Sequence, residues 1–157
     1  NETYIFKNSK LVSDGNSIFL SNNKNQFFSI SLKLGTINWT NKISSSLTPV
    51  LLDNLIFTIS SDGYLFTIDK NQGNILRVND IYNLYKSKHR NKTRPVGFSV
   101  GQDKLYLSNN DGKIIVINLS SGNVIKTEKI SGGLISEPFI FNRNLFVIKN
   151  GSVIKYN

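Results

Sequence analysis

Short runs of alternating apolar and polar residues recur along the chain, and turn-forming pairs separate them. Leu55–Phe57 and Leu65–Ile68, for example, flank the pair Asp62-Gly63. Runs of this length, rich in β-branched and aromatic residues and bounded by Asp, Asn and Gly, are typical of β-strands. An Asp-Gly or Asn-Gly pair between them indicates a tight hairpin, in which both central residues are expected to adopt positive φ. The pattern therefore predicts antiparallel hairpins.

The hairpins belong to a repeat. From Asn25 to Gly63 the spacing is 38 residues, from Gly112 to Gly151 it is 39, and from Gly63 to Gly112 it is 49, so one copy carries an insertion. Each copy has room for four short antiparallel strands, which is the blade of a β-propeller. We predict an all-β fold of about four blades in one domain, residues 1–157. The domain is either half of a larger propeller or a small closed ring.

The composition supports strands and adds a positive charge. Ala, the strongest helix former, is absent, whereas Ile, Leu, Phe and Val are abundant. The formal net charge of +9 favours acidic partners. Position 1 is not Met, so we expect the chain to follow a removed leader or an upstream domain.

Three isolated features have structural interpretations. His89 is the one His and lies among like charges, so we expect an exposed loop residue with no catalytic or metal-binding partners. Asp62, Asp69 and Asp111 occupy turn or strand-end positions of the repeat, where Asp caps backbone groups. Trp39, the one Trp, is expected to pack between blades.

The second copy of the repeat, with Asp53-Asn54-Leu55-Ile56-Phe57 and then Asp62-Gly63-Tyr64-Leu65-Phe66-Thr67-Ile68-Asp69, resembles the PQQ-like repeat. Gly35 followed by Trp39 resembles the signature ending of that repeat, whereas Arg77 and Lys126 stand where its Trp would be. WD repeats have a similar period, but the chain has no Gly-His and no Trp-Asp dipeptide. They are the weaker resemblance.

This resemblance implies one of two roles. Quinoprotein dehydrogenases with this repeat bind a quinone cofactor and Ca²⁺, whereas scaffolds of the BamB type are lipoproteins that assist the insertion of β-barrels into the outer membrane. A Ca²⁺ site needs several converging oxygen ligands. Here most of the seven Asp residues sit at turns and the three Glu residues are scattered. We therefore expect a scaffold, with no enzymatic activity, no cofactor and no metal.

The scaffold interpretation implies a periplasmic protein associated with the outer membrane. Its partners would be other proteins, such as an outer-membrane assembly complex, and an anchor preceding Asn1 would attach it peripherally to the membrane. Nucleic acid is not an expected partner. Two alternatives stay open, namely a fragment of a PQQ-dependent dehydrogenase and a ligand-sensing or nucleic-acid-binding propeller.

Residues 79–94 are the insertion into the repeat, and we name them the basic insertion. They hold five Lys or Arg residues, one His and one acidic residue, with two Tyr residues ahead of the basic run. Insertions in repeat proteins map to loops on one face, often the binding face. The hypothetical partner-binding residues are Tyr82, Tyr85, Lys86, Lys88, Arg90, Lys92 and Arg94. A helical turn is expected at Asp80–Tyr85, and a solvated loop without a partner is the alternative.

Overall fold

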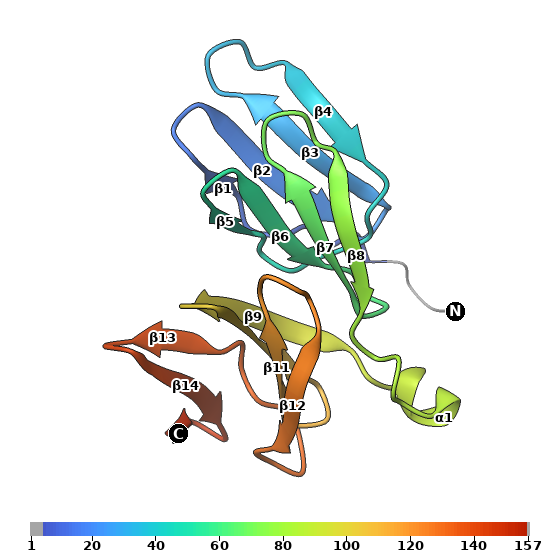
Figure 1. The fold of residues 1–157 in the computed structure, drawn as a ribbon, viewed down its shortest axis with the longest axis vertical. Coiled ribbons are helices and arrows are strands. Elements are labelled where there is room, and N and C mark those ends of the chain that lie inside the picture. Colours follow the sequence, from blue (N-terminus) through green and yellow to red (C-terminus); the bar gives the residue numbers. More distant parts are fainter. Residues whose placement is uncertain (1–4, 157) are drawn as a thin grey trace. The chain divides into compact units, whose positions relative to one another are not determined.

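The computed structural model describes residues 5–156, and these fold into four antiparallel sheets that follow one another along the chain. Two compact units contain them, Asn1–Val78 and Asn79–Asn157. Within each sheet, strands adjacent in sequence are adjacent in space (Figure 1). The predicted all-β class and the antiparallel blades are thus confirmed. In the described part of the chain the fourth sheet has three strands, and the others have four.

The strands are short, as the sequence pattern predicts. Sheet 1 comprises β1 (Val12–Ser13), β2 (Ser17–Asn22), β3 (Gln26–Ser31) and β4 (Ile37–Asn41). Sheet 2 comprises β5 (Val50–Leu52), β6 (Leu55–Ile59), β7 (Tyr64–Asp69) and β8 (Ile75–Asp80). Sheet 3 comprises β9 (Pro95–Gly101), β10 (Lys104–Asn109), β11 (Lys113–Asn118) and β12 (Val124–Lys129). Sheet 4 comprises β13 (Phe139–Phe141), β14 (Asn144–Lys149) and β15 (Ser152–Tyr156).

The hairpin turns need left-handed residues, as predicted, but not always in pairs. Asn150 and Gly151 both have positive φ, 49° and 77°. At Asp62-Gly63 and Asp111-Gly112 only the glycines do, with φ of 83° and 77°, so the expectation of two positive values was wrong there. In the first of these turns the Gly63 amide donates to the Ser60 carbonyl at 3.0 Å. This bond is typical of a type I turn followed by a β-bulge residue in the left-handed conformation, which here is Gly63.

Each unit has its own apolar core between its two sheets. In the first unit the buried core residues are Phe19, Phe27, Ile43, Ile56 and Ile68. In the second they are Ile114, Val116, Ile135, Leu145 and Val147. Ile43 and Ile135 lie in the connections between the sheets, and the other residues come from both sheets of their unit, so burial of apolar surface holds each pair of sheets together.

Trp39 packs between sheets 1 and 2, as predicted. Its ring is stacked on Phe27, with centroids 5.7 Å apart, and its indole nitrogen donates to the Lys70 carbonyl at 3.1 Å. Gly73 lies so close to the ring that a Cβ there would be 2.5 Å from it. Two residues further along β4, the Asn41 side-chain amide donates to the Gly73 carbonyl at 2.8 Å. Sheet 1 therefore contacts the β7–β8 turn of sheet 2 through both the Trp39 ring and the Asn41 side-chain amide.

Candidate partner-binding site

The basic insertion leaves sheet 2 at the end of β8 and returns to the repeat at Pro95, the first residue of β9. Residues 81–84 form a turn, and the one helix among the described residues, α1, spans Ser87–Arg90. The helical turn expected at Asp80–Tyr85 is therefore displaced toward the C-terminus. The Asp80 carboxylate accepts the Tyr82 amide at 3.0 Å, which favours a side-chain-closed turn there over a helix.

The start of the insertion is anchored in the second unit. Ile81 and Tyr82 are 2% and 1% exposed. The Tyr82 hydroxyl donates a hydrogen bond to the Asn109 side-chain oxygen at 2.6 Å, which satisfies it inside the protein. Burial raises the pKa of Tyr82 far above its ordinary value, so this hydroxyl stays a donor. Tyr82 thus holds the segment rather than facing solvent.

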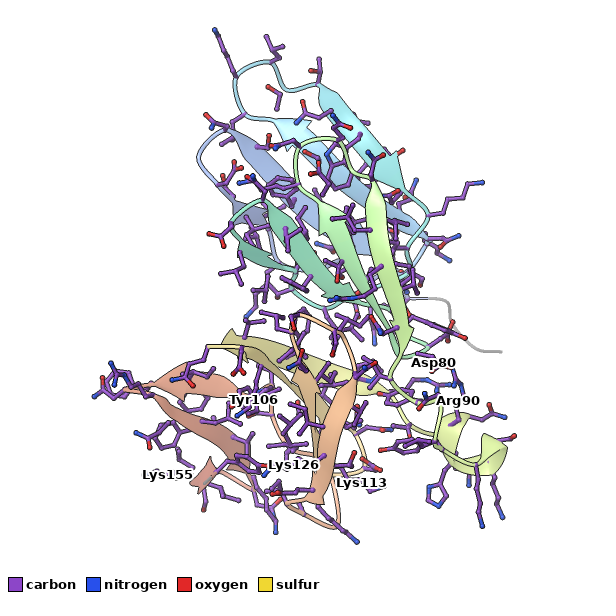
Figure 2. All side chains as sticks on the ribbon, viewed as in Figure 1. Asp80, Arg90, Tyr106, Lys113, Lys126 and Lys155 are labelled. Carbon is purple, nitrogen blue, oxygen red and sulfur yellow. The ribbon has the colours of Figure 1, made fainter. Side chains whose placement is uncertain are left out.

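An ion pair fixes α1 to the end of β8. One guanidinium nitrogen of Arg90 lies 2.9 and 2.8 Å from the two carboxylate oxygens of Asp80 (Figure 2). Both side chains are partly shielded from solvent. Asp80, the single acidic residue of the insertion, is therefore paired with Arg90, one of the five cationic residues of the insertion.

The end of the insertion is tied to the turn between β10 and β11. Thr93, which is 2% exposed, closes α1 by donating its hydroxyl to the His89 carbonyl at 2.9 Å. Asn110 accepts the Arg94 amide at 2.8 Å, and its own side-chain amide donates to the Lys92 carbonyl at 3.0 Å. The insertion is therefore an ordered loop that is hydrogen-bonded to the second unit at both of its ends.

Between these anchors the insertion presents positive charge. Lys86, Lys88, His89, Lys92 and Arg94 are exposed, and so is Leu84. Tyr85 is half-buried, and the Lys113 ammonium lies 5.1 Å from the centre of its ring, within the range of a cation–π contact. A shallow hollow is lined by Leu84, Tyr85, Lys86, His89, Lys113 and Thr127.

The structure thus divides the seven hypothetical binding residues into three groups. Tyr82 and Arg90 serve as anchors, and Tyr85 is half-buried in the hollow. Lys86, Lys88, Lys92 and Arg94 face solvent, and their role in binding stays a prediction. Lys113 joins the site although sequence reasoning missed it. Its one sequence signal is its place directly after the Asp111-Gly112 turn, next to the asparagines that anchor the insertion.

Lys113 is held in place by the turn that precedes it. Its ammonium lies 2.8 Å from the Asp111 carboxylate, and this hydrogen bond raises the Lys113 pKa. Burial raises the pKa of the neighbouring Tyr85 hydroxyl. Both groups therefore keep their protons around neutral pH. Asp111 balances the charge of Lys113, and Lys86 adds to the lining a positive charge that no ion pair with another described residue balances.

Neither a metal cluster nor a spanning helix is evident in the described residues. Among residues 5–156, no three His, Asp or Glu side chains gather as a metal site would require. No helix in that range is long and apolar enough to cross a membrane. Asp69 acts as a turn former, as predicted, because its carboxylate accepts the amides of Asn71 and Gln72 at 3.0 and 2.7 Å.

Residues 7–79, which include the strands of sheets 1 and 2 except the last residue of β8, match the family model described as outer membrane protein assembly factor BamB. The predicted resemblance is confirmed. Across the rest of the chain the likeness to BamB is one of fold. No curated protein matches the chain in sequence.

Solved structures show the same β-propeller fold. BamB from Moraxella catarrhalis is similar over 94% of this chain and 42% of its own, with 16% identity and a TM-score of 0.72. The computationally designed Ika4 protein is similar over 99% of this chain and 93% of its own, with 11% identity and a TM-score of 0.72. The chain therefore spans less than half the length of that BamB but nearly all of Ika4, so a half-propeller and a small ring both stay open.

Proposed function

We propose that this chain is a non-catalytic interaction scaffold with a BamB-like role in outer-membrane protein assembly. It would act in the periplasm, associated with the outer membrane, with other proteins of the assembly machinery as its partners. The observation that carries the proposal is the match of residues 7–79 to the BamB family model. The fold supports it, because stacked antiparallel sheets give a rigid frame on which loops can be displayed.

The basic insertion is the partner-binding element in this proposal. Four of its cations are exposed, Lys86, Lys88, Lys92 and Arg94, and none of them forms an ion pair with another described residue. Like charges gathered on a fastened loop repel one another, and an acidic partner would relieve that repulsion. The partner surface is therefore acidic, and charge attraction would raise the rate of association.

The test is binding to a purified outer-membrane protein assembly complex, measured on a sensor surface at low and at physiological salt. In the test variant, Lys86, Lys88, Lys92 and Arg94 become Gln, and Arg90 is kept because it pairs with Asp80. A matched control changes four exposed lysines elsewhere, Lys7, Lys33, Lys42 and Lys129, to Gln. Both variants lose four positive charges, so they differ only in where the charge is removed.

We expect the insertion variant to bind more weakly than the parent, most clearly at low salt, where screening is least. The control variant should bind nearly as well as the parent. If neither the parent nor the variants bind the complex, the assembly role is wrong. If both variants weaken equally, net charge rather than the insertion governs the contact. Binding to duplex DNA but not to the complex would favour the nucleic-acid alternative.

A further inference from the structure

A second positively charged hollow lies between sheets 3 and 4 and shares no residue with the hollow of the basic insertion. It is a groove of about 330 Å³ whose apolar floor includes Val116 and Leu145. Both of these residues belong to the core of the second unit. Tyr106 and Tyr156 add aromatic walls. Val116 and Leu145 are themselves only 2% and 6% exposed, so most of the apolar surface that the groove offers comes from Ile125, which is 50% exposed, and from the two tyrosines.

The charged residues of the groove are all cations, namely Lys104, Lys126 and Arg143. Lys126 forms an ion pair with Glu128 at 2.6 Å, and its ammonium lies 5.2 Å from the centre of the Tyr156 ring (Figure 2 labels Tyr106 and Lys126). Neither Lys104 nor Arg143 forms an ion pair with any other residue in the range 5–156. A concave site lined by charges of one sign concentrates ions of the opposite sign.

The first unit shows that a blade does not need a cation at the positions of Lys104 and Arg143, and sheet 1 shows the same for the position of Lys126. Lys126 pairs with Val116 just before a register shift, which is the place that Trp39 takes opposite Ser29 in sheet 1. Lys104 begins β10 as Leu55 begins β6. Arg143 is the second residue of its hairpin turn, where sheet 2 has Asn54. Sheet 2 has a cation, Arg77, at the position of Lys126, so two of the three positions, those of Lys104 and Arg143, are apolar or neutral in both sheets of the first unit and cationic around this groove.

Arg143 adds a backbone argument. It has a φ of 62° and follows Asn142, which is also left-handed at 47°. A long side chain at positive φ is uncommon, because Asn, Asp and Gly fit that conformation better. Arginine is thus an unusual choice for this turn, and it stands at a position that lines the groove. The groove also lies beside β15, the outer strand of sheet 4 in the described residues.

We infer that this groove binds a carboxylate that is attached to an apolar or aromatic group, as in an acidic peptide segment of a partner protein. The carboxylate would pair with Lys104 and Arg143, and the neighbouring apolar side chain would cover Tyr106, Ile125 and Tyr156. Groove sites of this size, with an apolar floor and few charged groups, are typical of ligand pockets. The inference goes beyond the proposed assembly role and does not depend on the basic insertion.

The test uses fluorescently labelled peptides and the complete chain in an anisotropy titration. The probe peptide contains Asp-Phe-Asp, and matched peptides contain Asn-Phe-Asn and Asp-Gly-Asp. Competition with inorganic phosphate distinguishes a peptide site from a site for any small anion. The main variant is Lys104→Leu with Arg143→Asn, which installs the residues that the second sheet carries at these positions. A second variant, Lys126→Trp, fills the groove with the residue that sheet 1 uses.

We expect saturable binding of the Asp-Phe-Asp peptide only, and a loss of about tenfold or more in the double variant, since two charge-assisted bonds disappear. Lys126→Trp should abolish binding, and Lys129→Gln should leave it unchanged. Displacement by millimolar phosphate, or equal binding of the Asn-Phe-Asn peptide, would overturn the inference. So would full binding by the double variant. Arg143→Asn alone suits a left-handed turn, so it reports on binding even if Lys126→Trp does not fold.

The same titration separates this inference from the proposed function. The insertion variant, with Gln at 86, 88, 92 and 94, should bind the Asp-Phe-Asp peptide as well as the parent does, whatever it does with the assembly complex. If the insertion variant loses the peptide and the groove variants keep it, the peptide binds at the insertion. In that case the groove inference is wrong, while the proposed role of the insertion stands.

Discussion

The contact between Trp39 and Gly73 predicts a large difference between two glycine substitutions that look alike in sequence. Gly35 and Gly73 both end a turn before the fourth strand of a blade, with φ of 68° and 76°. A Cβ added at Gly35 meets nothing within 4 Å, whereas one added at Gly73 lies 2.5 Å from the Trp39 ring. Gly35→Ala therefore measures left-handed strain alone, and Gly73→Ala measures the same strain plus a steric clash.

The two terms can be estimated separately. An alanine forced to remain left-handed costs about 1 kcal/mol. Inserting a methyl group into a packed contact costs about 1–3 kcal/mol more, because the ring must leave its rotamer or the turn must shift. We expect Gly35→Ala to lower the free energy of unfolding by about 1 kcal/mol and Gly73→Ala by about 2–4 kcal/mol.

Urea unfolding followed by tryptophan fluorescence is the assay, because Trp39 is the one Trp of the chain and reports on the first unit. Circular dichroism provides a second signal and serves for variants without Trp. A double variant, Trp39→Ala with Gly73→Ala, should cost less than the sum of its parts, since removing the ring removes the clash. Equal losses for the two single glycine variants, or strict additivity in the double variant, would refute the proposed packing of Trp39 on Gly73.

Four further predictions concern other parts of the chain. Gly112→Val should prevent stable folding of the second unit by thermal melting, because φ is +77° and backbone carbonyl oxygens occupy the space its Cβ would need. Arg90→Gln should lower the melting temperature slightly, by the stability of a partly exposed ion pair, at most about 1 kcal/mol, and the effect should be smaller in an Asp80→Asn background. The backbone amide of Ser17 holds the pKa of Asp14 below its usual value, so its charged form stabilises the fold. Asp14→Asn should thus lower the urea midpoint at neutral pH, and this difference should disappear as the pH falls through the folded-state pKa. Calorimetric titration with pyrroloquinoline quinone and Ca²⁺ should show no saturable heat, and micromolar binding would favour the dehydrogenase alternative.

The fold was predictable because its signals are local and repeated. A glycine such as Gly63 is needed wherever a hairpin turn passes through positive φ, so its spacing reveals the blade period. The turn type was less predictable. Asp62 and Asn150 precede a glycine in the same way, yet only Asn150 is left-handed. The loop of sheet 4 is one residue shorter, and loop length selects the turn geometry.

The basic insertion was predictable as a segment but not as a structure. Its charge and its departure from the repeat are visible in sequence, whereas its anchors join residues that only the fold brings together. The Tyr82 hydroxyl is hydrogen-bonded to Asn109, 27 residues away. Lys113, the first residue of β11, makes a cation–π contact with Tyr85. The Asp80–Arg90 pair spans ten residues across a turn whose path the sequence does not specify.

These anchors explain how a helix as short as α1 can be ordered at all. Four helical residues are far below the length at which a helix is stable in water. The order of α1 therefore comes from contacts on both sides of it. Tyr82 is bonded to Asn109 and the end of the insertion to Asn110, whereas Arg90 and Thr93 close the insertion on itself. Lys86, Lys88 and Lys92 are exposed and form no ion pair within residues 5–156, so we expect the frame to be stable without their charge. In the basic insertion, different residues therefore provide stability and charge. The anchoring residues stabilise the loop, and the exposed lysines carry its positive charge.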